Sequence, residues 1–126
     1  PFKGHLDGQT YTIRKLYSSR TTFLEKIGLI GYTQGASIKN FNNYGSSFQN
    51  YPATYLGLGA TLINNCQNSI IDNCKIYNPS IFYGGAGFIY EANKSTITNC
   101  YVSNYTMYDN LVGSGSAGFV IFQIVI

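Results

Sequence analysis

The fold is decided by the stretch Ser95-Thr96-Ile97-Thr98-Asn99-Cys100-Tyr101-Val102-Ser103, whose pattern recurs earlier in the chain. The clearest copies are Ser69-Ile70-Ile71-Asp72-Asn73-Cys74-Lys75-Ile76 and Ser37-Ile38-Lys39-Asn40-Phe41-Asn42-Asn43, and a fainter one is Thr12-Ile13-Arg14-Lys15-Leu16-Tyr17-Ser18. Repeats at intervals of about 20 to 50 residues indicate a solenoid, a propeller or a repeat array. The sequence therefore predicts a fold built from stacked copies of one short unit.

The copies align on an isoleucine, and the aligned columns predict which side chains face the interior. The isoleucine column holds Ile13, Ile38, Ile71 and Ile97, at intervals of 25, 33 and 26 residues. A column three residues later holds Leu16, Phe41, Cys74 and Cys100. We expect these side chains to form a core ladder, each lying above its counterpart in the next coil.

Between the two columns, Asn40, Asn73 and Asn99 stand where the chain is expected to bend. Strand side chains alternate between two faces, so residues three positions apart can both face inward only if a corner separates them. Asparagine is among the few non-glycine residues that tolerate a left-handed backbone, and stacked asparagines can hydrogen-bond along the stack. The pattern predicts two short strands that meet at an Asn corner.

A second series of apolar triplets precedes three of these copies and opens one more. The triplets are Gly28-Leu29-Ile30, Thr61-Leu62-Ile63, Gly87-Phe88-Ile89 and Gly118-Phe119-Val120. Short strands without a helical period predict an all-β fold, a single-stranded parallel β-helix (β-solenoid) of about four coils. Propeller blades need about 40 residues each and leucine-rich repeats need a denser leucine consensus, so another all-β fold is the main alternative.

The triplets resemble the motif of the GLUG-motif right-handed parallel β-helix proteins, which are surface and adhesin-like proteins. Gly28-Leu29-Ile30-Gly31 matches the Gly-Leu-apolar-Gly core of that motif, and two later triplets match it without the closing glycine. Residues 2–13 are similar to the sequence segment that begins the first coil in many such proteins. The resemblance implies a β-helix at a cell surface, and the motif describes a coil rather than a chemistry.

The composition is typical of a protein that neutral polar side chains keep in solution. Only 10% of the residues are charged, against a usual quarter, and the formal net charge is +3. Asp7 and Glu25 dilute the basic residues of the first 26 positions, which favours a solvated face over a nucleic-acid patch. We expect residues 1–126 to form a single β-solenoid domain, a fragment of, or a building block in, a longer assembly.

Carboxylates and the single histidine form no catalytic or metal-binding pattern. Asp72, Glu91 and Asp109 fall in different columns, whereas polysaccharide-cleaving β-helices need clustered acids. His5 has no Asp or Cys at ligand spacing. We therefore expect no catalytic residue, no metal site and no cofactor, and we expect that the protein is not an enzyme.

The three cysteines fit neither a disulfide framework nor a metal pattern. Cys74 and Cys100 share a column and are expected to stack inward as small apolar groups. A disulfide between adjacent coils is the alternative, subject to strict geometry. Cys66 follows Asn64 and Asn65, so we expect it in an exposed turn.

Residues 41–55 are rich in Asn, Ser, Tyr and Phe, and we expect a loop here. Tyr44 and Tyr51 in this loop could stack on sugar rings, because tyrosine offers a flat apolar face and a polar edge. The structural alternative is that such tyrosines cover the flank of the solenoid. Asn93 and Asn104 open two N-glycosylation sequons, which would be used if the protein passes through a secretory route.

The last segment combines strong hydrophobicity, high strand propensity and no charge. Its candidate self-association residues are Phe119, Ile121, Ile124 and Ile126. An uncovered strand of this kind favours edge-to-edge pairing. The first functional hypothesis is a non-catalytic structural or adhesive module, extracellular or on the cell surface, that stacks head to tail into a filament. The alternative is a carbohydrate-binding or polysaccharide-cleaving β-helix domain.

The expected partners follow from these hypotheses. They are copies of the same chain or adjoining coils of a longer chain, together with glycans. Since no run of 18 apolar residues exists, we expect no membrane span, and we expect no nucleic-acid partner.

Overall fold

The computed structural model describes residues 1–20, 28–50, 59–82, 85–108 and 119–124. Within these ranges the chain is all-β, with strands β1 to β16 and no helix. None of the described residues therefore belongs to a helix that could cross a bilayer. The strand pairs of these ranges are parallel.

The strands form four sheets of four strands each. Sheet 1 contains β1 (His5–Asp7), β5 (Ser37–Lys39), β9 (Ile70–Asp72) and β13 (Thr96–Thr98). Sheet 2 contains β2 (Thr12–Arg14), β6 (Asn42–Tyr44), β10 (Lys75–Tyr77) and β14 (Tyr101–Ser103). Sheet 3 contains β3 (Tyr17–Arg20), β7 (Ser47–Asn50), β11 (Ser80–Phe82) and β15 (Thr106–Tyr108). Sheet 4 contains β4 (Ile30–Gln34), β8 (Ile63–Gln67), β12 (Ile89–Asn93) and β16 (Val120–Ile124).

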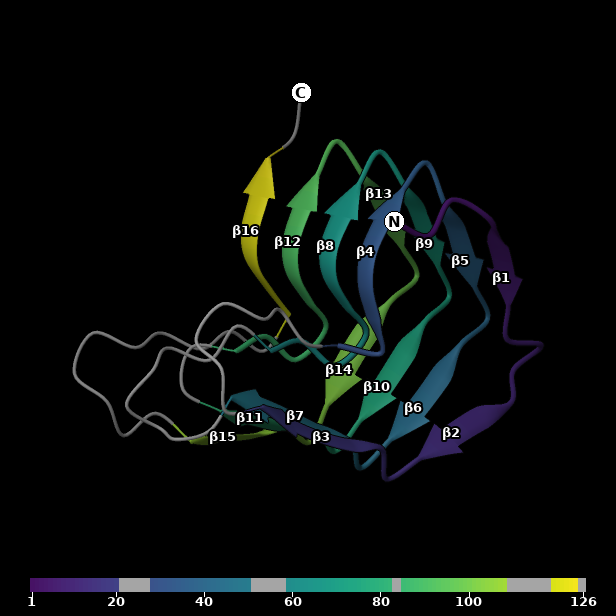
Figure 1. Cartoon of the computed structure of the whole chain (residues 1–126). Helices are drawn as coiled ribbons and strands as arrows, with labels where there is room; N and C mark the ends of the chain where they lie inside the picture. The colour runs from purple at the N-terminus through teal and green to yellow at the C-terminus, as the bar shows by residue number, and fades with distance from the viewer. Residues whose placement is uncertain (21–27, 51–58, 83–84, 109–118, 125–126) are drawn as a thin grey trace.

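The chain visits the four sheets in the same order four times. Each visit to all four sheets, called a pass below, adds one strand to every sheet. Strands four apart in the chain are therefore neighbours, as Figure 1 shows for β4, β8, β12 and β16. Since neighbouring strands lie about 4.8 Å apart, equivalent residues of successive passes lie one above the other.

The short strands of sheets 1 and 2 turn their middle residue inward. The middle residues of sheet 1 are Leu6, Ile38, Ile71 and Ile97, in register. Those of sheet 2 are Ile13, Asn43, Ile76 and Val102, also in register. The second and third members of both columns are completely buried. Burying an isoleucine such as Ile38, Ile71 or Ile76 contributes about 1.5–3 kcal/mol, so these isoleucines are a main source of stability.

The corner between sheets 1 and 2 is made by Asn40, Asn73 and Asn99. Their φ angles are 53°, 52° and 52°, in the left-handed region that asparagine tolerates. The Asn73 amide donates to the side-chain oxygen of Asn40 at 2.9 Å, and the Asn40 amide donates to Asp7 at 3.0 Å. Asn99 instead donates to Asp72 at 2.9 Å. The amide stack therefore runs over the first two asparagines and is continued by carboxylates.

The apolar triplets of sheet 4 follow the predicted alignment. Ile30, Ile63, Ile89 and Val120 are partners in register across the four strands. The rings of Phe88 and Phe119, one position earlier, stack with their centroids 4.7 Å apart. The alignment of these triplets is confirmed.

The first pass departs from the predicted alignment. Leu6 occupies the column of Ile38, whereas Ile13 pairs in register with Asn43 in sheet 2. The turn before β2 spans residues 8–11, while residues 40–41 suffice before β6. Gly8 in this longer turn has no room for a side chain, because a Cβ atom would lie 2.5 Å from the carbonyl oxygen of Asn40. The placement of Ile13 in the isoleucine column was therefore wrong.

The same shift moves Leu16 out of the predicted column of Phe41, Cys74 and Cys100. The Leu16 N–H donates to the Ser46 hydroxyl at 3.2 Å, which places Leu16 at the corner between sheets 2 and 3. Lys15 has a φ of 54° at this corner. The prediction for Leu16 was wrong because Ile13 belongs to sheet 2, so the residues after it form the next corner and not the corner of Phe41.

Two further expectations are corrected. Residues 42–44 and 47–50 form β6 and β7, so the predicted loop of residues 41–55 is not a loop up to residue 50. Cys66 is completely buried inside β8, not exposed in a turn. It lies in register with Thr33 and Ala92, which are also buried, because Asn65 and Gln67 on either side turn outward.

Candidate ligand-binding face

The outward face of sheet 2 is the candidate site. It carries the first and third residue of each strand, because the middle residue faces the core. The first residues are Thr12, Asn42, Lys75 and Tyr101, and the third residues are Arg14, Tyr44, Tyr77 and Ser103. These eight residues, called the sheet 2 face below, include three tyrosines, two cations and no carboxylate.

Hydrogen bonds and ring contacts hold the tyrosines of this face. The rings of Tyr77 and Tyr101 meet edge to face with their centroids 5.5 Å apart, and their hydroxyl groups are hydrogen-bonded to each other. The Asn78 amide donates to the Tyr44 hydroxyl at 2.8 Å. Tyr44 is 37% exposed and Tyr101 is 41% exposed. The face thus presents aromatic surface whose orientation is fixed before any ligand arrives.

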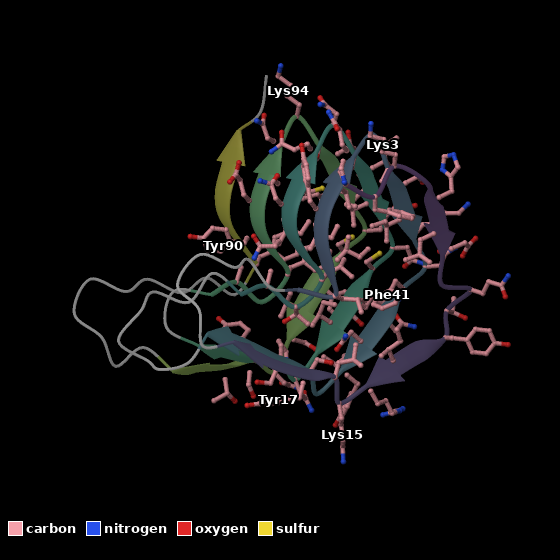
Figure 2. The ribbon with its side chains drawn as sticks, viewed as in Figure 1. Lys3, Lys15, Tyr17, Phe41, Tyr90 and Lys94 are labelled. Carbon is pink, nitrogen blue, oxygen red and sulfur yellow. The ribbon has the colours of Figure 1, made fainter. Side chains whose placement is uncertain are left out.

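Cations lie against two of these rings. The guanidinium carbon of Arg14 is 5.1 Å from the centre of the Tyr44 ring, and the Lys75 ammonium is 5.8 Å from that of Tyr101. At exposed positions such contacts contribute about 0.5–1 kcal/mol. Lys15 at the adjoining corner and Tyr17 at the start of β3 project away from the interior, whereas Phe41 lies inside (Figure 2). The exposed side of sheet 2 is therefore both aromatic and cationic.

The carboxylates of the neighbouring sheet 1 accept hydrogen bonds from the asparagines of the corner. Asp7, Lys39 and Asp72 follow one another in register on its outward side. The backbone N–H of Gln9, followed by the Asn40 amide, lowers the pKa of Asp7 below its ordinary value. Hydrogen bonds from Asn99 and then Thr98 lower the pKa of Asp72 in the same way. Both carboxylates are thereby kept ionised as acceptors, and the part of the chain that the structure describes has no metal-ligating cluster.

The cysteines are free, and two of them interact. The backbone N–H of Cys74 donates to the Cys100 sulfur at 3.4 Å, so these residues lie in successive passes as predicted. A separate hydrogen bond between the two thiol side chains, followed by burial, raises the pKa of Cys74. The same bond with Cys74 lowers the pKa of Cys100. Cys100 is therefore the more acidic thiol of the pair.

The two sequons differ in their surroundings. Asn104 is exposed at the corner between β14 and β15. The side-chain oxygen of Asn93 is enclosed, and the Ser95 hydroxyl of its sequon donates to the carbonyls of Cys66 and Asn93. The folded chain leaves Asn104 as the accessible acceptor of the two.

The remaining predicted site residues are placed in part. Tyr44 lies on the sheet 2 face, whereas Tyr51 and Ile126 lie outside the described residues. Ile121 and Ile124 belong to β16, which pairs with β12 at the edge of sheet 4. Phe119 packs on Phe88.

Sequence reasoning missed most of the sheet 2 face. It singled out Tyr44 but not Arg14, Lys75, Tyr77 or Tyr101. A signal was present, because each of these residues directly precedes or follows an inward column residue. The whole chain matches no protein-family model, no curated protein and no solved structure. Its function has to be argued from the face itself.

Proposed function

We propose that the protein is a non-catalytic structural or adhesive module, extracellular or on the cell surface, whose sheet 2 face binds carbohydrate. The proposed architecture is a single-stranded parallel β-helix of about four coils, one coil for each pass. This architecture is supported by the constant order of the sheets and by the stacking of equivalent residues. It gives the face a rigid base, since every strand of sheet 2 is anchored by a side chain in the core.

The observation that carries the binding function is the fixed set of exposed tyrosine rings. Sugar rings have apolar C–H faces and a rim of hydroxyl groups, so they pair with an aromatic face and nearby polar groups. Tyr44 and Tyr101 supply the rings. Thr12, Asn42 and Ser103 supply neutral polar groups on the same face. Because the rings are held by other side chains, little side-chain entropy is lost on binding.

The structural role is supported by the two ends of the core columns. Leu6 and Ile97 at the ends of the sheet 1 column are only half-buried, while Ile38 and Ile71 between them are completely buried. Among the described residues, the outermost strands of sheets 1 to 3 also leave one row of backbone groups without a partner strand. Such an end can accept an adjoining coil of a longer chain or a second copy of this one.

Binding to a panel of immobilised glycans tests the proposal. Wild-type protein should bind at least one glycan, and the double variant Tyr44→Ala/Tyr101→Ala should lose that binding. Tyr32→Ala is the matched control, because Tyr32 is 40% exposed on the outward side of sheet 4. Binding that survives in the double variant would contradict the site, and release of shortened sugars would contradict a non-catalytic role.

A further inference from the structure

The cations of the sheet 2 face have no anionic partner in the part of the chain that the structure describes. Neither Arg14 nor Lys75 is paired with a carboxylate among the described residues, and the eight positions of the face include no acid. Sheet 1 shows the contrast, because there the Lys39 ammonium lies 3.8 Å from an Asp7 oxygen. Positive charge is balanced on sheet 1 and left open on sheet 2.

The positions of the cations relative to the rings define a repeated unit. Arg14 is in β2 with Tyr44 beside it in β6, and Lys75 is in β10 with Tyr101 beside it in β14. Each cation lies against its ring, and the Arg14 side chain is exposed while that of Lys75 is half-buried. The two cations are two strands apart, or roughly 10 Å at the usual strand spacing. The face therefore offers two ring and cation pairs along the direction in which the strands stack.

We infer that the ligand of this face is a linear acidic polysaccharide, whose sugar rings lie on Tyr44 and Tyr101 and whose anionic groups pair with Arg14 and Lys75. This inference rests on the proposed function, which is carbohydrate binding by the sheet 2 face, and it specifies further that the carbohydrate is negatively charged. Arg14 can grip a carboxylate or sulfate with two N–H groups, whereas Lys75 acts as a compact point charge. The negative charge of such a polysaccharide comes either from carboxylate groups or from sulfate groups.

Single-stranded nucleic acid is the rival ligand, because it also combines stacking rings with negative charge. Its binding depends on a positively charged groove that follows the phosphate backbone, and its affinity grows with the number of phosphates neutralised. The sheet 2 face has two cations among its eight residues, and neutral hydroxyl and amide groups take three other places. This ratio of cations to neutral polar groups fits a ligand that has many hydroxyl groups and widely separated negative charges.

Affinity electrophoresis against polygalacturonate and its fully methyl-esterified form tests the inference. The two polymers share a backbone and differ in charge. Wild-type protein should bind polygalacturonate about tenfold more tightly than the methyl ester, which is the effect expected of two exposed ion pairs. This preference for the charged polymer should shrink as the salt concentration is raised. Dextran sulfate in a parallel lane distinguishes sulfate from carboxylate.

The double variant Arg14→Gln/Lys75→Gln should lose the preference for the charged polymer and keep the weaker binding of the ester. Lys94→Gln is the matched control, because Lys94 lies on the opposite side of the molecule from Lys15 (Figure 2). Equal binding of both polymers by the wild type, with both bindings lost in Tyr44→Ala/Tyr101→Ala, overturns the inference and leaves the proposed function intact. Tighter binding of single-stranded DNA than of any polysaccharide overturns both.

Discussion

Asn43 is the residue whose replacement tests the core most directly. It is the middle residue of β6, faces inward between Ile13 and Ile76, and is completely buried. Neither its side-chain nitrogen nor its side-chain oxygen has a hydrogen-bond partner. An amide enclosed in this way loses its bonds to water and gains none, which destabilises the folded state by about 1–3 kcal/mol.

Asn43→Val removes the unpaired amide and continues the apolar column. Valine is the strand-forming apolar residue nearest to asparagine in size, so it overpacks the site less than leucine or isoleucine would. Valine also has the higher strand propensity. We expect the free energy of unfolding to rise by about 1–3 kcal/mol, which follows from relief of the unpaired amide.

Urea unfolding followed by circular dichroism measures the change. The midpoint should rise while the dependence on urea concentration stays the same, which identifies a change in stability rather than in compactness. Asn42→Val is the matched control, because Asn42 gains the same strand propensity but faces outward and donates to the Thr10 carbonyl at 2.9 Å. A lower midpoint for Asn43→Val would refute the reasoning, since it would mean that the amide is satisfied in the folded protein.

The remaining predictions concern the sheet 1 column, a carboxylate and the cysteine pair. Ile71→Ala should lower the free energy of unfolding by about 2–5 kcal/mol, whereas Ile70→Ala, at a position 55% exposed, should change it far less; similar losses would disprove the inward column. The lowered pKa of Asp72 means that its stabilising effect is complete above the unfolded pKa of about 3.9 and is lost as pH falls through the folded value. Asp72→Asn should therefore weaken the acid dependence of urea unfolding between about pH 5 and pH 2, and an unaltered dependence would speak against this role. Iodoacetamide should label Cys100 before Cys74, because the pKa of Cys100 is lowered and that of Cys74 is raised, and peptide mass spectrometry showing the opposite order would contradict this assignment.

The parts of the fold that the sequence predicted are those with a local physical cause. Asn73 and Asn99 mark a corner because few other side chains tolerate a left-handed backbone, and both have a positive φ. Ile63 and Ile89 align because each belongs to an apolar triplet at a constant distance from that corner. In both cases the local structure of a position limits which residue types can occupy it.

The first pass shows where this reasoning fails. Leu6 and Ile13 are both apolar and both face inward, but they belong to different sheets. Sheets 1 and 2 present the same outward, inward, outward pattern, so chemistry alone does not tell one column from the other. In both sheets the corner residue stands two positions after the inward isoleucine and has a positive φ, as Lys15 does after Ile13 and Asn40 after Ile38, so the two corners look alike in the sequence.

Cys66 was misplaced for a related reason. Asn64 and Asn65 before it suggested a turn, yet Asn65 lies in β8 and faces outward in register with Glu91. A polar residue next to a cysteine is what any strand with one solvated face requires. Whether a single residue of a strand is buried depends on whether it occupies an inward or an outward position. The residue types around it do not reveal that position.

The sheet 2 face could not be predicted as a set, because its members are brought together by stacking and not by sequence. Arg14 and Tyr44 are 30 positions apart in the chain and become partners in register. The inward columns are constrained by the packing of one pass on the next, whereas the outward positions are free to differ from pass to pass. Three tyrosines and two cations without a carboxylate are therefore not required by the fold. A composition that packing does not demand supports the proposal of a ligand for this face, and the spacing of the strands would set the distances between the rings and charges of such a ligand.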